Sequence, residues 1–142
     1  WRSTKVLNIS KKEIKHIKYT NYLKPEESYL LKTNPIKLIN SKNQEIAYNK
    51  EKISILLNSF TKLNCESYKQ EKQKIESTIQ IEELIINSDT LKTYKISKNE
   101  KKSKEENFTI KRKYATLNNG DLMLIQDYVF NKVLISITEL TN

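Results

Sequence analysis

The hydrophobic residues of this chain follow one clear helical period, within residues 49–64. Apolar side chains at positions 53, 56, 57, 60 and 63 would share one face of an α-helix. Polar residues fill most of the remaining circumference, and Asn49 can accept hydrogen bonds from the first-turn N–H groups. The pattern predicts a helix over residues 49–64. We interpret its apolar face as the cover of a small sheet rather than a partner-binding stripe, because no other segment offers comparable cover.

Most of the remaining chain alternates between apolar and polar residues, as strands do. A helical turn at 10–13 is expected to lead into a strand over about 15–22, and strands 28–33 and 36–40 should form a hairpin. Further strands are expected at 65–68, 81–87, 91–97, 108–117 and 122–125, with a helical turn near 72–78. The tail 128–140 has helical spacing and predicts a second, C-terminal helix.

These elements predict one α+β domain of 142 residues, with small antiparallel sheets packed on one amphipathic helix. The order of elements is not βαβα, so a doubly wound nucleotide fold is not expected. The single glycine, Gly120, falls in the turn 118–121 that should join the last two strands.

The net charge of +9 is uneven along the chain. Residues 1–70 carry 14 Lys and Arg against 6 Asp and Glu, whereas residues 71–142 carry 12 against 11. We therefore single out Lys11, Lys12, Lys15 and Lys18 as candidate contacts with an anionic surface, either lipid headgroups or nucleic acid. The alternative is codon bias, since Lys, Asn, Ile and Tyr are all over-used.

Sequence-specific reading of nucleic acid is disfavoured, because arginine occurs only at Arg2 and Arg112. Tyr94, Phe108 and Tyr114 could form a stacking platform for single-stranded nucleic acid. The simpler interpretation is that these rings fill the core.

No residue pattern indicates catalysis, a metal site or a cofactor. Cys65 and His16 are the only residues of their kinds, so thiolate clusters and histidine metal sites lack ligands. The adjacent acidic pairs 26–27, 82–83 and 105–106 would diverge on a strand, so none forms an acid–base dyad. We predict that the protein is not an enzyme.

Three segments resemble a bacterial domain family of unknown function that occurs in envelope proteins, often beside ABC-type transport or gliding-motility components. They are 7–19, the hairpin and helix within 28–63, and 113–115 followed by 121–127. The resemblance implies an accessory or interaction domain on the periplasmic side, near the membrane, with protein partners. Because family members follow a membrane helix, we expect an anchoring segment before Trp1. The alternative is a cytoplasmic, basic nucleic-acid-binding module.

Overall fold

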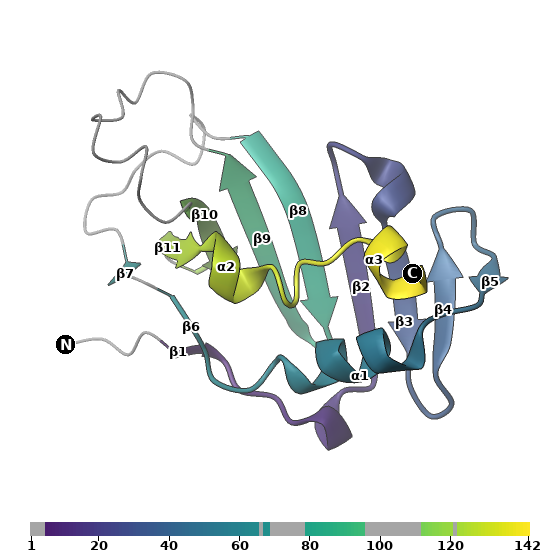
Figure 1. Cartoon of the computed structure of the whole chain (residues 1–142). Helices are drawn as coiled ribbons and strands as arrows, with labels where there is room; N and C mark the ends of the chain where they lie inside the picture. The colour runs from purple at the N-terminus through teal and green to yellow at the C-terminus, as the bar shows by residue number, and fades with distance from the viewer. Residues whose placement is uncertain (1–4, 66, 69–78, 96–111, 121) are drawn as a thin grey trace.

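The computed structural model describes residues 5–65, 67–68, 79–95, 112–120 and 122–142, which are built around a large antiparallel sheet (Figure 1). Its strands are hydrogen-bonded in the order β5-β4-β3-β2-β8-β9-β10-β11-β7. They are β2 (His16–Asn21), β3 (Tyr29–Lys32), β4 (Lys37–Asn40), β5 (Glu45–Ile46), β7 (Ser67–Tyr68), β8 (Ile79–Ile86), β9 (Asp89–Lys95), β10 (Arg112–Leu117) and β11 (Met123–Gln126). A second sheet pairs β1 (Lys5–Leu7) with β6 (Leu63–Asn64).

The helices in the described part of the chain are short and lie on one face of the large sheet (Figure 1). They are α1 (Lys50–Asn58), α2 (Asp127–Phe130) and α3 (Ile137–Thr141), with 3-10 turns η1 (Lys11–Glu13) and η2 (Pro25–Glu27). The structure is therefore mostly β, and the predicted α+β fold with small sheets packed on one long helix is wrong. None of the described helices has the length and apolarity needed to cross a membrane.

The predicted helix over 49–64 begins as expected but ends at Asn58. Asn49 caps it, since its side chain accepts hydrogen bonds from the backbone N–H groups of Glu51 and Lys52. At the other end, the side chains of Asn58 and Ser59 donate to backbone carbonyls four residues earlier, which competes with continued helix. The apolar period continues through Phe60 and Leu63, but Leu63 is recruited into β6 by pairing with β1.

The predicted C-terminal helix over 128–140 is also shorter than expected. It is divided into α2 and α3 by residues 131–136, which cross the sheet in a non-helical conformation. Phe130, Val133, Leu134, Ile137 and Leu140 are buried along this segment. The C-terminal segment therefore covers the sheet together with α1, and the expectation that only one helix could do so is wrong.

The hydrophobic core lies between the sheet and these covering segments. Alternate strand residues such as Ile17, Leu31, Leu38 and Leu84 point into it and are fully buried together with Leu56 of α1. The intervening strand residues must therefore point to the opposite face, which none of the described helices covers (Figure 1). This division into two faces determines where every candidate site lies.

Several predicted strands are confirmed. The hairpin of 28–33 with 36–40 is β3 and β4, the strand over 15–22 is β2, and those over 81–87, 91–97 and 122–125 are β8, β9 and β11. The strand expected at 65–68 is reduced to β7, and that over 108–117 is described only from residue 112, as β10. The helical turn expected near 72–78, residues 96–97 of the strand expected over 91–97, and residues 108–111 lie outside the described residues.

Candidate functional site

The four lysines predicted to contact an anionic surface do not act from one face. Lys11 and Lys12 are exposed in η1, and the Lys11 ammonium lies 3.4 Å from the Ser54 hydroxyl of α1, on the helix side. Lys15 is exposed in the following segment. Lys18 lies between two buried residues of β2, so strand alternation directs it to the opposite, uncovered face. The four lysines therefore do not form one surface, because Lys11 and Lys18 lie on opposite sides of the sheet.

The fold instead gathers a different set of basic residues around Lys18. In the strand register, His16 lies opposite Lys32, and Lys32 lies opposite Lys37, all on the uncovered face. Lys18 is on the same face, two residues from His16. We call His16, Lys18, Lys32 and Lys37 the basic patch. Lys32 and Lys37 lie in the predicted hairpin of residues 28–33 and 36–40, and the register of that hairpin is the signal that could have placed them opposite each other.

The lysines of the basic patch make no ion pair within the described part of the chain, although the register also places Glu45 and Glu83 on this face. There, the ammonium groups of Lys18, Lys32 and Lys37 have no ion pair or hydrogen bond. Like charges directly opposite on neighbouring strands destabilise a sheet. An anionic partner would relieve this repulsion between Lys32 and Lys37.

Aliphatic side chains border the patch. Leu30 lies opposite Lys18 on one side and opposite Ile39 on the other, and both aliphatic side chains are only half-buried. The surface thus combines cationic side chains with accessible apolar ones. Such a combination suits an interface where anionic headgroups meet hydrocarbon.

The aromatic platform is wrong for its two described members. Tyr94 and Tyr114 lie opposite each other on β9 and β10, but their side chains are only 7% and 2% exposed. They form a small apolar cluster with Leu122 that is separate from the main core, so the rings are buried as the simpler interpretation expected but do not fill the core under the helices. Phe108 lies outside the described residues.

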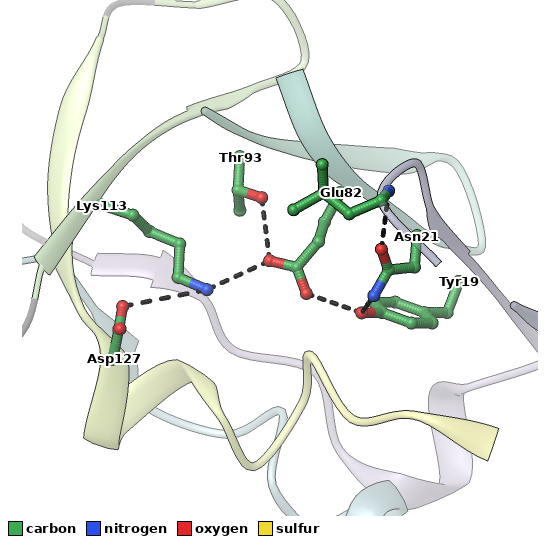
Figure 2. Close-up of polar contacts among 7 residues, drawn as sticks. Tyr19, Asn21, Glu82, Thr93, Lys113 and Asp127 are labelled. Atoms are coloured by element: carbon green, nitrogen blue, oxygen red, sulfur yellow. Dashed lines mark hydrogen bonds and ion pairs between the residues drawn. The ribbon is translucent and has the colours of Figure 1, made fainter. Parts of the chain in front are cut away.

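The helix-covered face holds a second polar feature, a network centred on the buried Glu82 carboxylate (Figure 2). Oε2 of Glu82 accepts a hydrogen bond from the Tyr19 hydroxyl at 2.6 Å. Oε1 accepts from the Thr93 hydroxyl at 3.0 Å and from the Lys113 ammonium at 3.1 Å. The Lys113 ammonium also lies 3.8 Å from Asp127 of α2. This network satisfies a charge that would be costly to bury alone.

Strand alternation explains why Glu82 and not Glu83 enters this network. Glu82 lies opposite Asn21 of β2 and Thr93 of β9, on the helix-covered face. Glu83 points to the other face, where it accepts a hydrogen bond from Tyr22 at 2.9 Å. The predicted divergence of this acidic pair is confirmed. No local pattern indicates the partners of Glu82, because they come from β2, β9 and β10.

A pocket of about 470 Å³ opens beside Glu82, between the sheet, η2 and the C-terminal segment. We call it the Glu82 pocket. Its lining residues come from four parts of the chain: Tyr19, Asn21, Lys24, Glu27, Glu82, Asn131, Leu134, Ile135, Ser136 and Glu139. Hydrogen bonds join η2 to α3 at the edge of this pocket. The Glu27 carboxylate accepts them from the Thr138 N–H at 3.2 Å and from the Thr138 hydroxyl at 2.6 Å.

Two buried tyrosines lie beside this network and give a testable prediction. The rings of Tyr19 and Tyr29 have centroids 5.4 Å apart. Burial raises the pKa of both hydroxyls, and the Glu82 carboxylate raises the pKa of Tyr19 further. The Tyr29 hydroxyl finds no hydrogen-bond partner among the described residues. Because an unsatisfied buried polar group costs about 1–3 kcal/mol, Tyr29→Phe should raise the free energy of unfolding by about 1 kcal/mol at neutral pH.

The same substitution should change the response to alkali. A raised native pKa means that full stability holds below the unfolded pKa of about 10 and is lost as the pH rises above it, by about 1.4 kcal/mol per pH unit and group. Tyr29→Phe removes the contribution of one tyrosine, so its free energy of unfolding should fall less steeply as the pH rises. Urea titrations between about pH 8 and pH 11 measure this slope. Tyr128→Phe, at a 62% exposed position, is the control. Equal alkaline slopes for Tyr29→Phe and the unmodified protein would contradict this prediction.

Within the described residues, no three His, Cys, Asp or Glu side chains are grouped closely enough to hold a metal ion. The chain matches no model of a known protein family. Searches of curated proteins and of solved structures likewise found no match. The function must therefore be argued from the two features above, the basic patch and the Glu82 pocket.

Proposed function

We propose that the chain is a non-enzymatic interaction domain of the bacterial cell envelope, on the periplasmic side, whose basic patch lies against anionic lipid headgroups. The observation that carries the proposal is the direct opposition of Lys32 and Lys37, beside Lys18 and His16, on a sheet face that no described helix covers. The envelope location is part of the same proposal and rests on the sequence resemblance to envelope domains. Protein partners would be membrane proteins or other envelope components beside this surface.

Two observations favour lipid over nucleic acid as the anionic partner. The half-buried Leu30 and Ile39 give the patch an apolar border that suits a lipid interface. The rings that could stack on bases, Tyr94 and Tyr114, are buried. A cytoplasmic nucleic-acid-binding module remains the alternative. Comparing vesicle binding with oligonucleotide binding distinguishes the two functions.

Neutralising the opposed lysines should weaken vesicle binding strongly. We expect the protein to co-sediment with vesicles of phosphatidylcholine and phosphatidylglycerol, but not with phosphatidylcholine alone, and to be released by salt. Because each lysine near an anionic surface contributes about 1 kcal/mol, Lys32→Gln/Lys37→Gln should bind about 30-fold more weakly. The double variant should remain folded, since it removes a repulsion.

The matched control is Lys50→Gln/Lys132→Gln, which removes the same charge from exposed positions of α1 and of the segment after α2. It should bind vesicles nearly as well as the unmodified chain. Equal losses for the two double variants would show that only net charge matters and would overturn the patch. Tighter, salt-sensitive binding to an oligonucleotide than to the anionic vesicles would favour the nucleic-acid alternative.

A further inference from the structure

The Glu82 pocket lies on the opposite side of the sheet from the basic patch, so it can act independently of membrane contact. It is a hollow of about 470 Å³, within the size range of about 300–1,000 Å³ that is typical of small-molecule sites. The sheet supplies its floor through Tyr19, Asn21 and Glu82, and the C-terminal segment supplies a wall. The bonds between Glu27 and Thr138 hold that wall against η2.

The floor presents a fixed carboxylate. Glu82 is only 8% exposed, and its orientation is set by three hydrogen bonds from three different strands. A carboxylate oxygen can accept about two hydrogen bonds. Oε2 receives one from the described residues, that of Tyr19, so it keeps the capacity to accept a donor from a ligand.

The character of the lining indicates the charge of the ligand. Three carboxylates, those of Glu27, Glu82 and Glu139, line the pocket together with the ammonium of Lys24. Because Lys113 pairs with Glu82 from outside the lining, one negative charge remains in excess. This lining is acidic in a chain whose net charge is +9, so codon bias toward lysine does not account for it. An anionic ligand would meet repulsion here, whereas a cation would be attracted.

The remaining walls indicate the shape of the ligand. Leu134 and Ile135 add aliphatic surface beside the carboxylates. Methylene groups can pack on such surface while an ammonium group donates to the carboxylates. We propose that the Glu82 pocket binds a small aliphatic amine, with its ammonium group at Glu82 and its methylene chain against Leu134 and Ile135.

The probe that tests this site is 1,5-diaminopentane, measured by isothermal titration calorimetry on the whole chain. Its two controls are 1,5-pentanediol, which has the same chain without charge, and glutarate, which has the opposite charge. The diamine should bind at least about tenfold more tightly than either control. Equal binding of diamine and diol, or tighter binding of glutarate, would overturn the proposal.

Two substitutions locate the binding. Glu82→Gln should weaken diamine binding about tenfold or more, because it removes the floor charge. Because Glu82→Gln can also lower stability, Glu139→Gln is the second substitution. Glu139 is exposed, so Glu139→Gln should weaken diamine binding several-fold without lowering the melting temperature. Glu51→Gln, at an exposed site on α1, is the matched control and should bind normally. Unchanged binding in Glu139→Gln would place the diamine elsewhere. Vesicle binding should be the same in all three variants, so this proposal and the membrane proposal can fail separately.

Discussion

Replacing Phe60 by alanine should lower the free energy of unfolding by about 3–5 kcal/mol. Phe60 is fully buried just after α1, and its carbonyl accepts a hydrogen bond from the Ile9 N–H at 2.9 Å. The side chain therefore packs where the end of α1 meets the segment after β1. Truncation removes a large apolar group from a fully buried site and leaves a cavity that the surrounding residues fill only in part.

Urea denaturation monitored by circular dichroism measures this loss. Leu56→Ala, at a fully buried position of α1, should lose about 2–5 kcal/mol. Leu23→Ala is the control, since Leu23 is 65% exposed and its truncation should cost less than about 0.5 kcal/mol. A loss below about 1 kcal/mol for both buried positions would show that α1 does not pack as described.

Within residues 49–64, the period of apolar residues predicted burial correctly but overestimated the length of the helix. Ile53, Leu56, Leu57, Phe60 and Leu63 are all buried, yet only the first three belong to α1. Burial and helical conformation separate after Asn58, because Leu63 gains strand hydrogen bonds from β1. A pairing between residues so distant in sequence leaves no mark in the local period.

The size of the sheet was underestimated for a related reason. Short alternating runs identified most strands, but the pairing of β2 with β8 joins the first hairpin to the later strands across the intervening helix. That pairing converts small sheets into one large sheet. The helix α1 alone is too short to cover this large sheet, and the C-terminal segment covers the rest. That segment is rich in β-branched residues and crosses the sheet without forming one continuous helix.

The candidate sites were predictable to different degrees. Lys32 and Lys37 belong to a hairpin that the sequence predicted, so counting the register back from its turn would have placed them opposite each other. The Glu82 network was not predictable, because Tyr19, Thr93 and Lys113 meet it through pairings across β2, β9 and β10. The Lys113 side chain is only 14% exposed, and no local pattern in the sequence marks it as different from the many exposed lysines.

Breaking the ion pair between Glu82 and Lys113 should be strongly destabilising, while replacing both partners should not be. Glu82→Met leaves the Lys113 ammonium largely buried with only the 3.8 Å contact to Asp127, and we expect a loss of about 3 kcal/mol. Lys113→Met leaves a buried carboxylate with two hydroxyl donors and should cost about 2–3 kcal/mol. In Glu82→Met/Lys113→Met no charge is left unpaired at these two positions, so the total loss should be only about 1 kcal/mol.

A double-mutant cycle in urea denaturation measures this coupling, with Glu83→Met as control because Glu83 points to the other face of the same strand. Additive losses in the double variant would contradict the coupling of the pair. Near-normal stability in the double variant would have a second consequence. An apolar pair would then serve the fold as well as the charged pair, so stability alone would not explain a carboxylate at this position. The same double variant should then fail to bind the diamine while remaining folded, which separates the role of Glu82 in binding from its role in the core.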